Sequence, residues 1–242
     1  MNGVRRDGRA PDCLREVSIS PGYIATAEGS ALVEFGNTRV LCAATVEDAV
    51  PQWMRGSGRG WVTAEYSMLP RATTTRTQRE AVRGKQSGRT MEIQRLIGRA
   101  LRASIDLDVL GERSIIVDCD VIQADGGTRT AAITGGFVAL ALAVRQLGQF
   151  KQVVKNPILE HVAAVSVGVV AGTPVLDLNY DEDSAAHVDM NVVMTGAGRF
   201  IEVQATGEKA TFEDSQLARM IQLARGGIET LIAIQKRVLS GA

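Results

Sequence analysis

The sequence contains little of the chemistry that cysteine and histidine provide. Its three cysteines, Cys13, Cys42 and Cys119, form no Cys-x-x-Cys pair, so neither a disulfide framework nor a thiolate metal site is expected. Cys42 and Cys119 lie in apolar, strand-like segments, where we predict buried thiols. The two histidines, His161 and His187, are far apart in the sequence. They give little support to a histidine-based zinc site or a Ser–His–Asp triad.

The sequence also lacks the marks of secreted and membrane proteins. Its charged N-terminus is not followed by an apolar segment, so we expect no signal peptide. No apolar run is expected to reach the length that crosses a bilayer. A chain of 242 residues with 45% hydrophobic and 22% charged residues is typical of a soluble globular protein with a large core. We therefore predict a cytoplasmic protein without membrane contact.

The neutral net charge conceals two regions of opposite sign. Residues 55–102 contain eleven basic and three acidic residues, whereas residues 177–214 contain nine acidic and two basic ones. Only five of the 27 basic residues are lysines. Arginine suits two-pronged contacts with phosphate and stacking on bases. This asymmetry indicates a nucleic-acid partner.

The apolar pattern predicts an α+β protein in which strands precede helices twice. Strands are expected at residues 14–19, 30–35, 38–46, 61–68, 114–122, 162–170, 175–178, 188–195 and 200–205, and helices at 89–104, 131–147 and 213–239. Both series run through antiparallel hairpins before a helix. We infer a weak internal duplication of a strand-rich unit rather than a doubly wound parallel sheet, with approximate halves 1–150 and 151–242.

The segment Gln-Ala-Asp-Gly-Gly-Thr-Arg-Thr at residues 123–130 lies where an apolar strand turns into a long apolar helix. The first turn of a helix has free N–H groups and a partial positive charge, which attract anions. Gly127, Thr128 and Arg129 could therefore hold a phosphate. The alternative is that Thr128 caps the helix and Arg129 is a surface charge.

Two further basic features accompany this turn. The helix at residues 89–104 has an apolar face and begins with Arg89, whose charge opposes the helix dipole and favours a bound anion. The segment 71–85 has almost no apolar residues and is rich in arginine. Such a long segment is either a solvated loop or a contact with nucleic acid or a neighbouring subunit.

An acidic cluster follows at residues 177–191, where Asp183 and Asp189 bracket a short turn. Magnesium takes oxygen ligands and usually only one or two protein carboxylates, beside water and substrate phosphate. The pair could therefore hold magnesium. The alternative is a polar turn in which Asp181 or Asp183 caps backbone N–H groups.

Blocks of residues in the same order along nearly the whole chain resemble the bacterial ribonuclease PH family. The blocks lie at residues 5–9, 27–30, 38–42, 60–66, 68–73, 84–86, 88–89, 92–99, 118–130, 182–184 and 189–191. The resemblance implies a ribosomal-protein-S5-domain-2-like α+β fold, internally duplicated, in a single domain over residues 1–242. It also implies a ring of six subunits, a trimer of dimers, related to polynucleotide phosphorylase and the exosome ring.

The family resemblance implies a phosphate-dependent 3′–5′ exoribonuclease, also described as a tRNA nucleotidyltransferase. Such an enzyme trims the 3′ ends of tRNA precursors, and of other structured RNAs such as rRNA. It releases nucleoside diphosphates and adds nucleotides in the reverse direction. The alternatives are a non-catalytic RNA-binding ring subunit and a hydrolytic nuclease.

The same resemblance assigns roles to particular residues. Inorganic phosphate, the co-substrate, would be held by Arg89, Gly127, Thr128 and Arg129. Mg²⁺ would be held by Asp183 and Asp189, which with Arg89 form the catalytic set. We expect RNA to contact exposed arginines, namely Arg71, Arg76, Arg79, Arg95 and Arg99.

Overall fold

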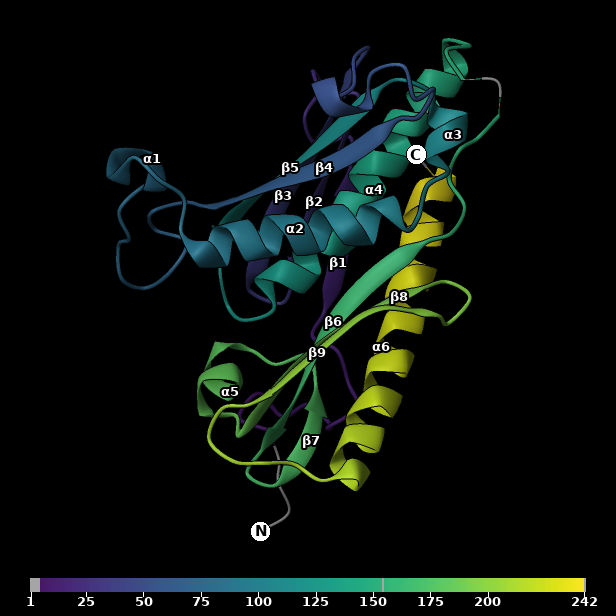
Figure 1. The fold of residues 1–242 in the computed structure, drawn as a ribbon. Helices are drawn as coiled ribbons and strands as arrows, with labels where there is room; N and C mark the ends of the chain where they lie inside the picture. The colour runs from purple at the N-terminus through teal and green to yellow at the C-terminus, as the bar shows by residue number, and fades with distance from the viewer. Residues whose placement is uncertain (1–4, 154, 242) are drawn as a thin grey trace.

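The computed structural model describes residues 5–153 and 155–241, and it confirms the α+β class (Figure 1). The strands are β1 (Val17–Pro21), β2 (Gly29–Phe35), β3 (Thr38–Glu47), β4 (Trp61–Met68), β5 (Ser114–Gln123), β6 (Val162–Val170), β7 (Thr173–Leu176), β8 (Val188–Thr195) and β9 (Phe200–Gly207). The helices are α1 (Glu80–Arg83), α2 (Gly88–Arg102), α3 (Leu107–Leu110), α4 (Thr128–Gln149), α5 (Tyr180–Ala185) and α6 (Asp214–Gly241), with the 3-10 turn η1 (Gln52–Met54).

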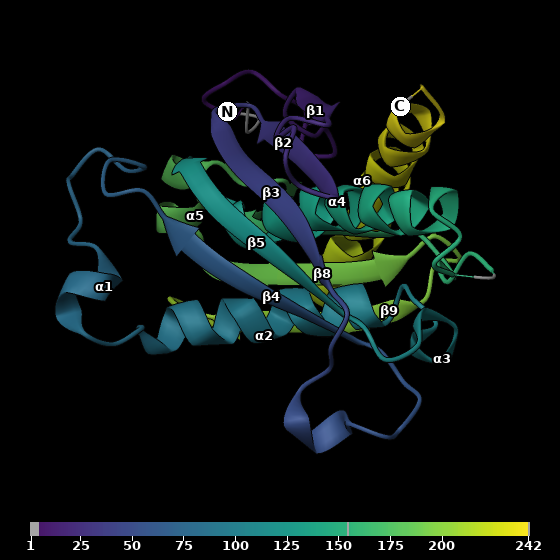
Figure 2. The same cartoon turned by 90° about the horizontal axis from the view of Figure 1, so that it is seen from above.

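The first sheet has the strand order β1-β2-β3-β5-β4. Its strands pair antiparallel except β4 and β5, which run parallel. Side chains alternate between its faces: Val62, Ala64 and Tyr66 of β4 are buried, while their neighbours are more exposed. The buried face packs on α2 and α4, and Figure 2 shows β3, β5 and β4 crossing over these helices.

The second sheet has the strand order β7-β6-β8-β9 and is antiparallel throughout. Its central strand β6 is buried along almost its whole length because α4 packs on it from one side and α6 from the other. Helix α6 runs along this sheet and also contacts β1 of the first sheet. The two halves of the chain therefore share one continuous hydrophobic core.

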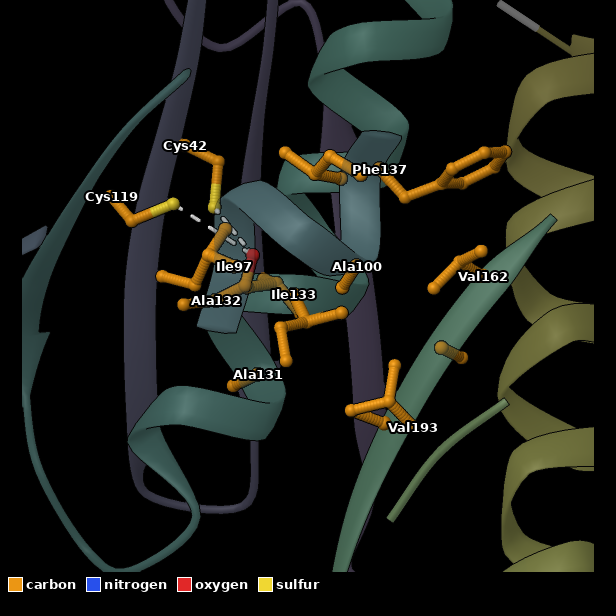
Figure 3. Packing of buried hydrophobic residues seen from close by; sticks show 14 of the residues in the cluster. Cys42, Ile97, Ala100, Cys119, Ala131, Ala132, Ile133, Phe137, Val162 and Val193 are labelled. Atoms are coloured by element: carbon orange, nitrogen blue, oxygen red, sulfur yellow. Dashed lines mark hydrogen bonds between the residues drawn. The ribbon is translucent and has the colours of Figure 1, made fainter. Parts of the chain in front are cut away.

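Helix α4 fills the space between the two sheets (Figures 1 and 2). It is apolar around its circumference because it contacts β2 and β3 on one side and β6 on the other. Gly135 permits a close approach, since a Cβ there would lie 2.6 Å from a methyl carbon of Val33. Figure 3 shows the thiols of Cys42 and Cys119 both directed at the Ala132 carbonyl oxygen, each 3.8 Å away. Both are free, buried thiols, as predicted.

The expectation that no apolar segment reaches membrane-spanning length is wrong for α4. Residues Thr128–Gln149 are long and apolar enough to cross a bilayer, with a mean hydropathy of 1.5. However, 72% of its most apolar 18-residue stretch is buried inside the protein. The hydropathy of α4 therefore reflects its position as a core helix between two sheets.

The predicted strands and long helices are confirmed, with shifts of a few residues at their ends. The predicted hairpin of β2 and β3 is confirmed, and Gly36 at its turn has a left-handed backbone with φ of 55°. The buried face of α2 carries the predicted apolar residues Ile93, Leu96 and Ile97. The sequence reading missed the short helices α1, α3 and α5. Helices of four to six residues are too short to display a periodic apolar face.

Candidate active site

The turn between β5 and α4 leaves the N-terminus of α4 open to a ligand. Gly127 is the N-cap residue, with left-handed φ and ψ of 65° and 25°, and over the described chain no side chain caps this helix start. The backbone N–H groups of Thr128 and Arg129 thus remain available to an anion. The predicted strand-to-helix turn is confirmed, and the alternative in which Thr128 caps the helix is wrong.

The Thr128 side chain instead contacts a tyrosine of the first sheet. Its Oγ1 lies 2.8 Å from the hydroxyl of Tyr66, which is buried on β4. Burial raises the pKa of the Tyr66 phenol, against the hydrogen bond with Thr128 and the positive charges of Arg89 and Arg129. Tyr66 is therefore neutral at physiological pH and fixes the orientation of Thr128.

Two arginines approach this turn from different helices. Arg89 is the second residue of α2 and is exposed, and Arg129 is the second residue of α4. A guanidinium nitrogen of Arg129 lies 3.4 Å from the Gln204 side-chain oxygen and 3.7 Å from a Glu92 carboxylate oxygen. Both arginines are close enough to Asp183 to act against the rise in the pKa of its carboxyl. Two helix starts and two arginines thus converge on one place.

The predicted carboxylate pair lies beside these arginines. Asp183 is in α5, and Asp189 is the second residue of β8. Burial raises the pKa of Asp183. Burial first, and then the negative charge of Asp183, raise the pKa of Asp189 to about 6, against the charge of Arg129. The exposed Glu208 raises the pKa of both aspartates further, so three carboxylates share this end of the second sheet.

Local sequence explains why Asp183 is held on a helix. Asn179 caps α5 by accepting from the Glu182 N–H at 3.0 Å, and the Glu182 carboxylate accepts from the Asn179 N–H at 3.1 Å. This reciprocal capping box stabilises a helix start that has few turns of its own. The alternative in which Asp181 or Asp183 provides the cap is wrong, because Asn179 does.

The turn at residues 124–129, named the phosphate turn here after the ligand predicted for it, packs directly against the start of α5. Asp125 accepts from the Tyr180 N–H at 3.1 Å. Gly126 has φ of 73°, and a Cβ at this position would lie 2.5 Å from the Leu178 carbonyl oxygen. Only glycine permits both this backbone conformation and this approach. The contact joins the segment that presents Arg129 to the helix that presents Asp183.

The carboxylate pair fits a hard divalent cation in its chemistry. Its oxygens are desolvated and repel each other, and neither Asp183 nor Asp189 forms an ion pair within the described chain. Across residues 5–153 and 155–241, no three His, Cys, Asp or Glu side chains are placed so that together they could hold a metal ion. Asp183 and Asp189 could hold Mg²⁺ as two carboxylate ligands, with water and substrate as the others, which is the pattern that Mg²⁺ prefers.

A cavity of about 890 Å³ opens beside Tyr66 and Arg89. One wall is formed by β4 and β5 and the other by the arginine-rich segment 77–87. Burial, followed by the charges of Glu65 and Asp120, raises the pKa of Asp118 on the first wall. Arg79 on the opposite wall acts against the rise that burial causes in the pKa of Asp120. The cavity is therefore lined by opposite charges.

The predicted RNA-contacting arginines occupy two regions. Arg71, Arg76 and Arg79 are exposed on the segment beside this cavity, and Arg79 lines it. Arg95 is exposed on α2. Arg99 is also exposed on α2, but it forms a 2.7 Å ion pair across to Glu202 of β9. Within the predicted basic face of α2, Arg99 is therefore engaged in an ion pair with the second sheet.

Several residues of this site were missed by sequence reasoning. Tyr66 lies on the buried face of a strand, where the alternating pattern predicts a core residue. Gln204 lies in β9 and Glu208 directly follows that strand, and neither belongs to a motif that marks it. A polar hydroxyl at a core position was the one available signal for Tyr66, since a buried phenol requires a partner.

The chain matches two family models in succession. The model of the 3′ exoribonuclease family, domain 1, matches residues 13–146, and that of domain 2 of the same family matches residues 161–227. The chain is 60% identical over 238 residues to ribonuclease PH of Solibacter usitatus, which covers 98% of this chain and 100% of that protein. It is 59% identical over 237 residues to ribonuclease PH of Listeria innocua, at 98% and 96% coverage.

Solved structures of more distant proteins share the architecture. Rice (Oryza sativa) Rrp46 superposes with a TM-score of 0.79 at 19% identity, over 97% of this chain and 100% of that one. A chain of an archaeal exosome core superposes with a TM-score of 0.76 at 20% identity, over 96% and 91%. At such identities these similarities establish the fold alone.

Proposed function

The chain belongs to the 3′ exoribonuclease family, with ribonuclease PH proteins as near relatives, and on this premise we propose that it degrades RNA from the 3′ end by phosphorolysis. Its substrates are tRNA precursors and other structured RNAs such as rRNA. It releases nucleoside diphosphates and, in reverse, adds nucleotides from them. The observation that carries this proposal is the convergence of Arg89, the open start of α4 and the Asp183–Asp189 pair.

In this mechanism the protein positions an anion that is itself the nucleophile. The N–H groups at Gly127–Arg129 and the Arg89 guanidinium hold inorganic phosphate. A phosphate oxygen forms a bond to the phosphorus of the terminal phosphodiester, and the bond to the 3′ oxygen of the penultimate nucleotide breaks. That oxygen takes up the proton that hydrogen phosphate brings. The terminal nucleotide leaves as a nucleoside diphosphate.

The remaining residues position the groups and balance their charges. Tyr66 orients Thr128, and the positive charge of Arg129 acts on the Asp189 carboxylate. Asp183 and Asp189 would hold Mg²⁺, which neutralises charge that develops on the phosphoryl oxygens. Because the nucleophile is already an anion, the reaction requires no strong general base.

The assembly we propose is a ring of six subunits, a trimer of dimers, in the cytoplasm. The free thiols of Cys13, Cys42 and Cys119 support a reducing compartment. Size-exclusion chromatography with light scattering on the native protein tests the assembly: six times the 25.8 kDa chain mass is expected, and a stable monomer or dimer at micromolar concentration would contradict it.

The alternative from another class is a non-catalytic RNA-binding ring subunit. Loss of catalysis would be expected to leave gaps among the phosphate-binding and carboxylate residues. Arg89, Thr128, Arg129, Asp183 and Asp189 are all present, and the charges of the two arginines act on the aspartates. This complete set favours catalysis.

One assay separates phosphorolysis from its alternatives. RNA with a single-stranded 3′ tail is incubated with the protein and Mg²⁺, with and without inorganic phosphate, and the released mononucleotide is identified. Nucleoside diphosphates that form only when phosphate is present are expected. Monophosphates would indicate hydrolysis, and RNA binding without any release would indicate the non-catalytic subunit.

A further inference from the structure

The N-terminal arm, residues 5–15, crosses onto the second half of the chain without forming a helix or strand. Two of its arginines, Arg5 and Arg15, are among the few buried charged residues, at 7% and 8% exposure. Burying a guanidinium is costly unless its charge and donors are matched. Their partners therefore indicate what the arm does.

Arg15 joins the phosphate turn to a buried carboxylate. Its guanidinium donates to both carboxylate oxygens of Asp177, at 2.7 and 3.0 Å, and its backbone N–H donates to the same residue at 2.8 Å. The other side of the guanidinium donates to the carbonyl oxygens of Asp125 and Gly126. A Cβ on Gly127 would lie 3.1 Å from it. Arg15 thus contacts the turn at Asp125 and Gly126, whereas Tyr66 contacts it at Thr128.

Arg5 contacts α5, the helix that carries Asp183. It donates to both oxygens of Glu182 at 2.5 and 2.6 Å, the geometry of a two-pronged arginine–carboxylate pair. Glu182 belongs to the capping box of α5 and directly precedes Asp183. Arg5 also donates to the carbonyl oxygens of Leu176 and Asp177 at 2.7 and 2.8 Å.

Asp177 and Arg9 connect the contacts of Arg15 with those of Arg5. Asp177 is completely buried and has φ of 54°, a conformation that costs free energy for a residue other than glycine. Arg9 donates to the Asp177 carbonyl oxygen at 3.1 Å and lies 3.4 Å from its carboxylate and 3.5 Å from that of Glu182. One network thus spans from the phosphate turn to the helix that carries Asp183.

We propose that Arg5, Arg9 and Arg15 form a brace, built on Asp177 and Glu182, that sets the position of the phosphate turn relative to the Asp183 carboxylate. These arginines are positioning residues and do not contact the substrate. The inference rests on the proposed phosphorolytic function. Binding groups tolerate little displacement from their productive positions. Loosening the brace at the phosphate turn should therefore weaken phosphate binding, and loosening it at α5 should weaken Mg²⁺ binding.

Arg15→Lys tests the end at the phosphate turn, because lysine keeps the charge but cannot bridge Asp177 and two carbonyls at once. We expect the KM for inorganic phosphate to rise about tenfold while the KM for RNA stays within about twofold. In metal-free protein, the rise in Tm that inorganic phosphate causes should shrink. A residue with only a structural role would lower the Tm of the unliganded protein and leave both phosphate readouts unchanged.

Arg5→Lys tests the end at α5. The Mg²⁺ concentration for half-maximal activity should rise about tenfold and the Mg²⁺-induced rise in Tm should shrink, with little change in the KM for phosphate. The matched control is Arg6→Gln, because Arg6 pairs with Asp181 of α5 through side chains that are 84% and 63% exposed. This control should behave as wild type in every readout.

If Arg15→Lys does not fold, Arg9→Gln serves in its place, since Arg9 makes the longer contacts of the brace. We expect smaller changes in both the phosphate and the Mg²⁺ readouts. Folded variants with unchanged phosphate and Mg²⁺ dependence would overturn the brace. Failure of the proposed function is distinguishable, because the wild-type protein would then show neither stabilisation by phosphate nor phosphate-dependent release of nucleotides.

Discussion

The charged side chains at this site have opposing effects on the pKa of Asp183. Arg89 and Arg129 oppose the rise in the pKa of Asp183, whereas Glu208 and burial reinforce it. The arginines are therefore partly neutralised by carboxylates before any ligand binds. A bound phosphate would offset the positive charge of the arginines, and a bound cation would offset the negative charge of the carboxylates. The site is therefore suited to holding both ligands together.

The phosphate assignment can be tested with Arg89→Ala and Arg129→Ala. Each removes a charge-assisted hydrogen bond to the anion, and such bonds contribute about 1.5–3 kcal/mol. We expect the KM for phosphate to rise about tenfold to a hundredfold, measured from initial rates, with RNA affinity largely kept. Arg39→Ala is the control, since Arg39 is an exposed arginine paired with Glu34. Equal loss of RNA affinity in the two site variants would contradict the assignment.

Asp189→Asn should stabilise the metal-free protein at neutral pH while it abolishes turnover. The pKa of Asp189 is about 6 in the fold and 3.8 as an unperturbed group. Ionised Asp189 therefore destabilises the fold above pH 6, and the destabilisation disappears as pH falls through 6 toward 3.8. We expect a gain of about 1–3 kcal/mol at pH 7.5 and almost none at pH 4.

Urea unfolding in the presence of a chelator measures this gain at both pH values. The matched control is Asp181→Asn, an aspartate of the same cluster whose side chain is 63% exposed. It should change stability little at either pH. A gain for Asp189→Asn that persists at pH 4 would show that lost charge is not its cause.

Two secondary-structure elements meet where the phosphate turn packs on α5. Helix α4 presents its open N-terminus, and α5 presents Asp183 from a short helix that its capping box stabilises. Gly126 allows the two backbones to touch. Since the proposed phosphate and Mg²⁺ ligands come from both helix starts, we expect this contact to set the geometry of the site.

Gly126→Ala tests the contact between the two elements. A Cβ at this position would meet the backbone of Leu178 and Asn179 at 2.5 and 2.7 Å, so the turn and α5 must separate. We expect a loss of at least about 2 kcal/mol in unfolding free energy and a large loss of phosphorolysis. Gly84→Ala is the matched control, with φ of 72° and open space around its Cβ. Equal effects of the two variants would exclude the clash as the cause.

At the scale of the whole molecule, the charge segregation seen in the sequence becomes a spatial arrangement. The arginine-rich segment 71–87 projects with α1 from the edge of the first sheet, while the acidic cluster lies at the end of the second sheet (Figure 1). The cavity beside Arg89 lies between that segment and the sheet. Arg89 lines this cavity together with Arg79, so we predict that RNA guided by the arginine-rich segment approaches the site along it.

Arg76→Gln combined with Arg79→Gln tests this approach path. Because phosphate contacts release counterions, losing two should lower the slope of log K against log salt by about 1.5 and raise the KM for RNA about tenfold at low salt. The KM for inorganic phosphate should stay unchanged. RNA binding measured by fluorescence anisotropy over a salt series provides the readout. An unchanged salt slope would place the RNA elsewhere.

The sequence by itself determined the strands, the long helices and the chemical character of the site residues. Hairpin turns, alternating strands and the amphipathic α2 follow from local patterns, because backbone preference and the period of apolar residues act within a few residues. The Gly127–Arg129 turn and the acidic cluster were visible for the same reason. The family resemblance then led from these separate features to the prediction of phosphorolysis.

Tertiary structure alone decided which of these pieces meet. Helix α4 has the composition of a membrane span, and only packing between two sheets identifies it as a core helix. Tyr66, Glu208 and Arg15 join the site from β4, the end of β9 and the N-terminal arm. Their roles depend on distances between segments that are far apart in the sequence. No local pattern encodes such distances, because they arise only when both sheets close on one core.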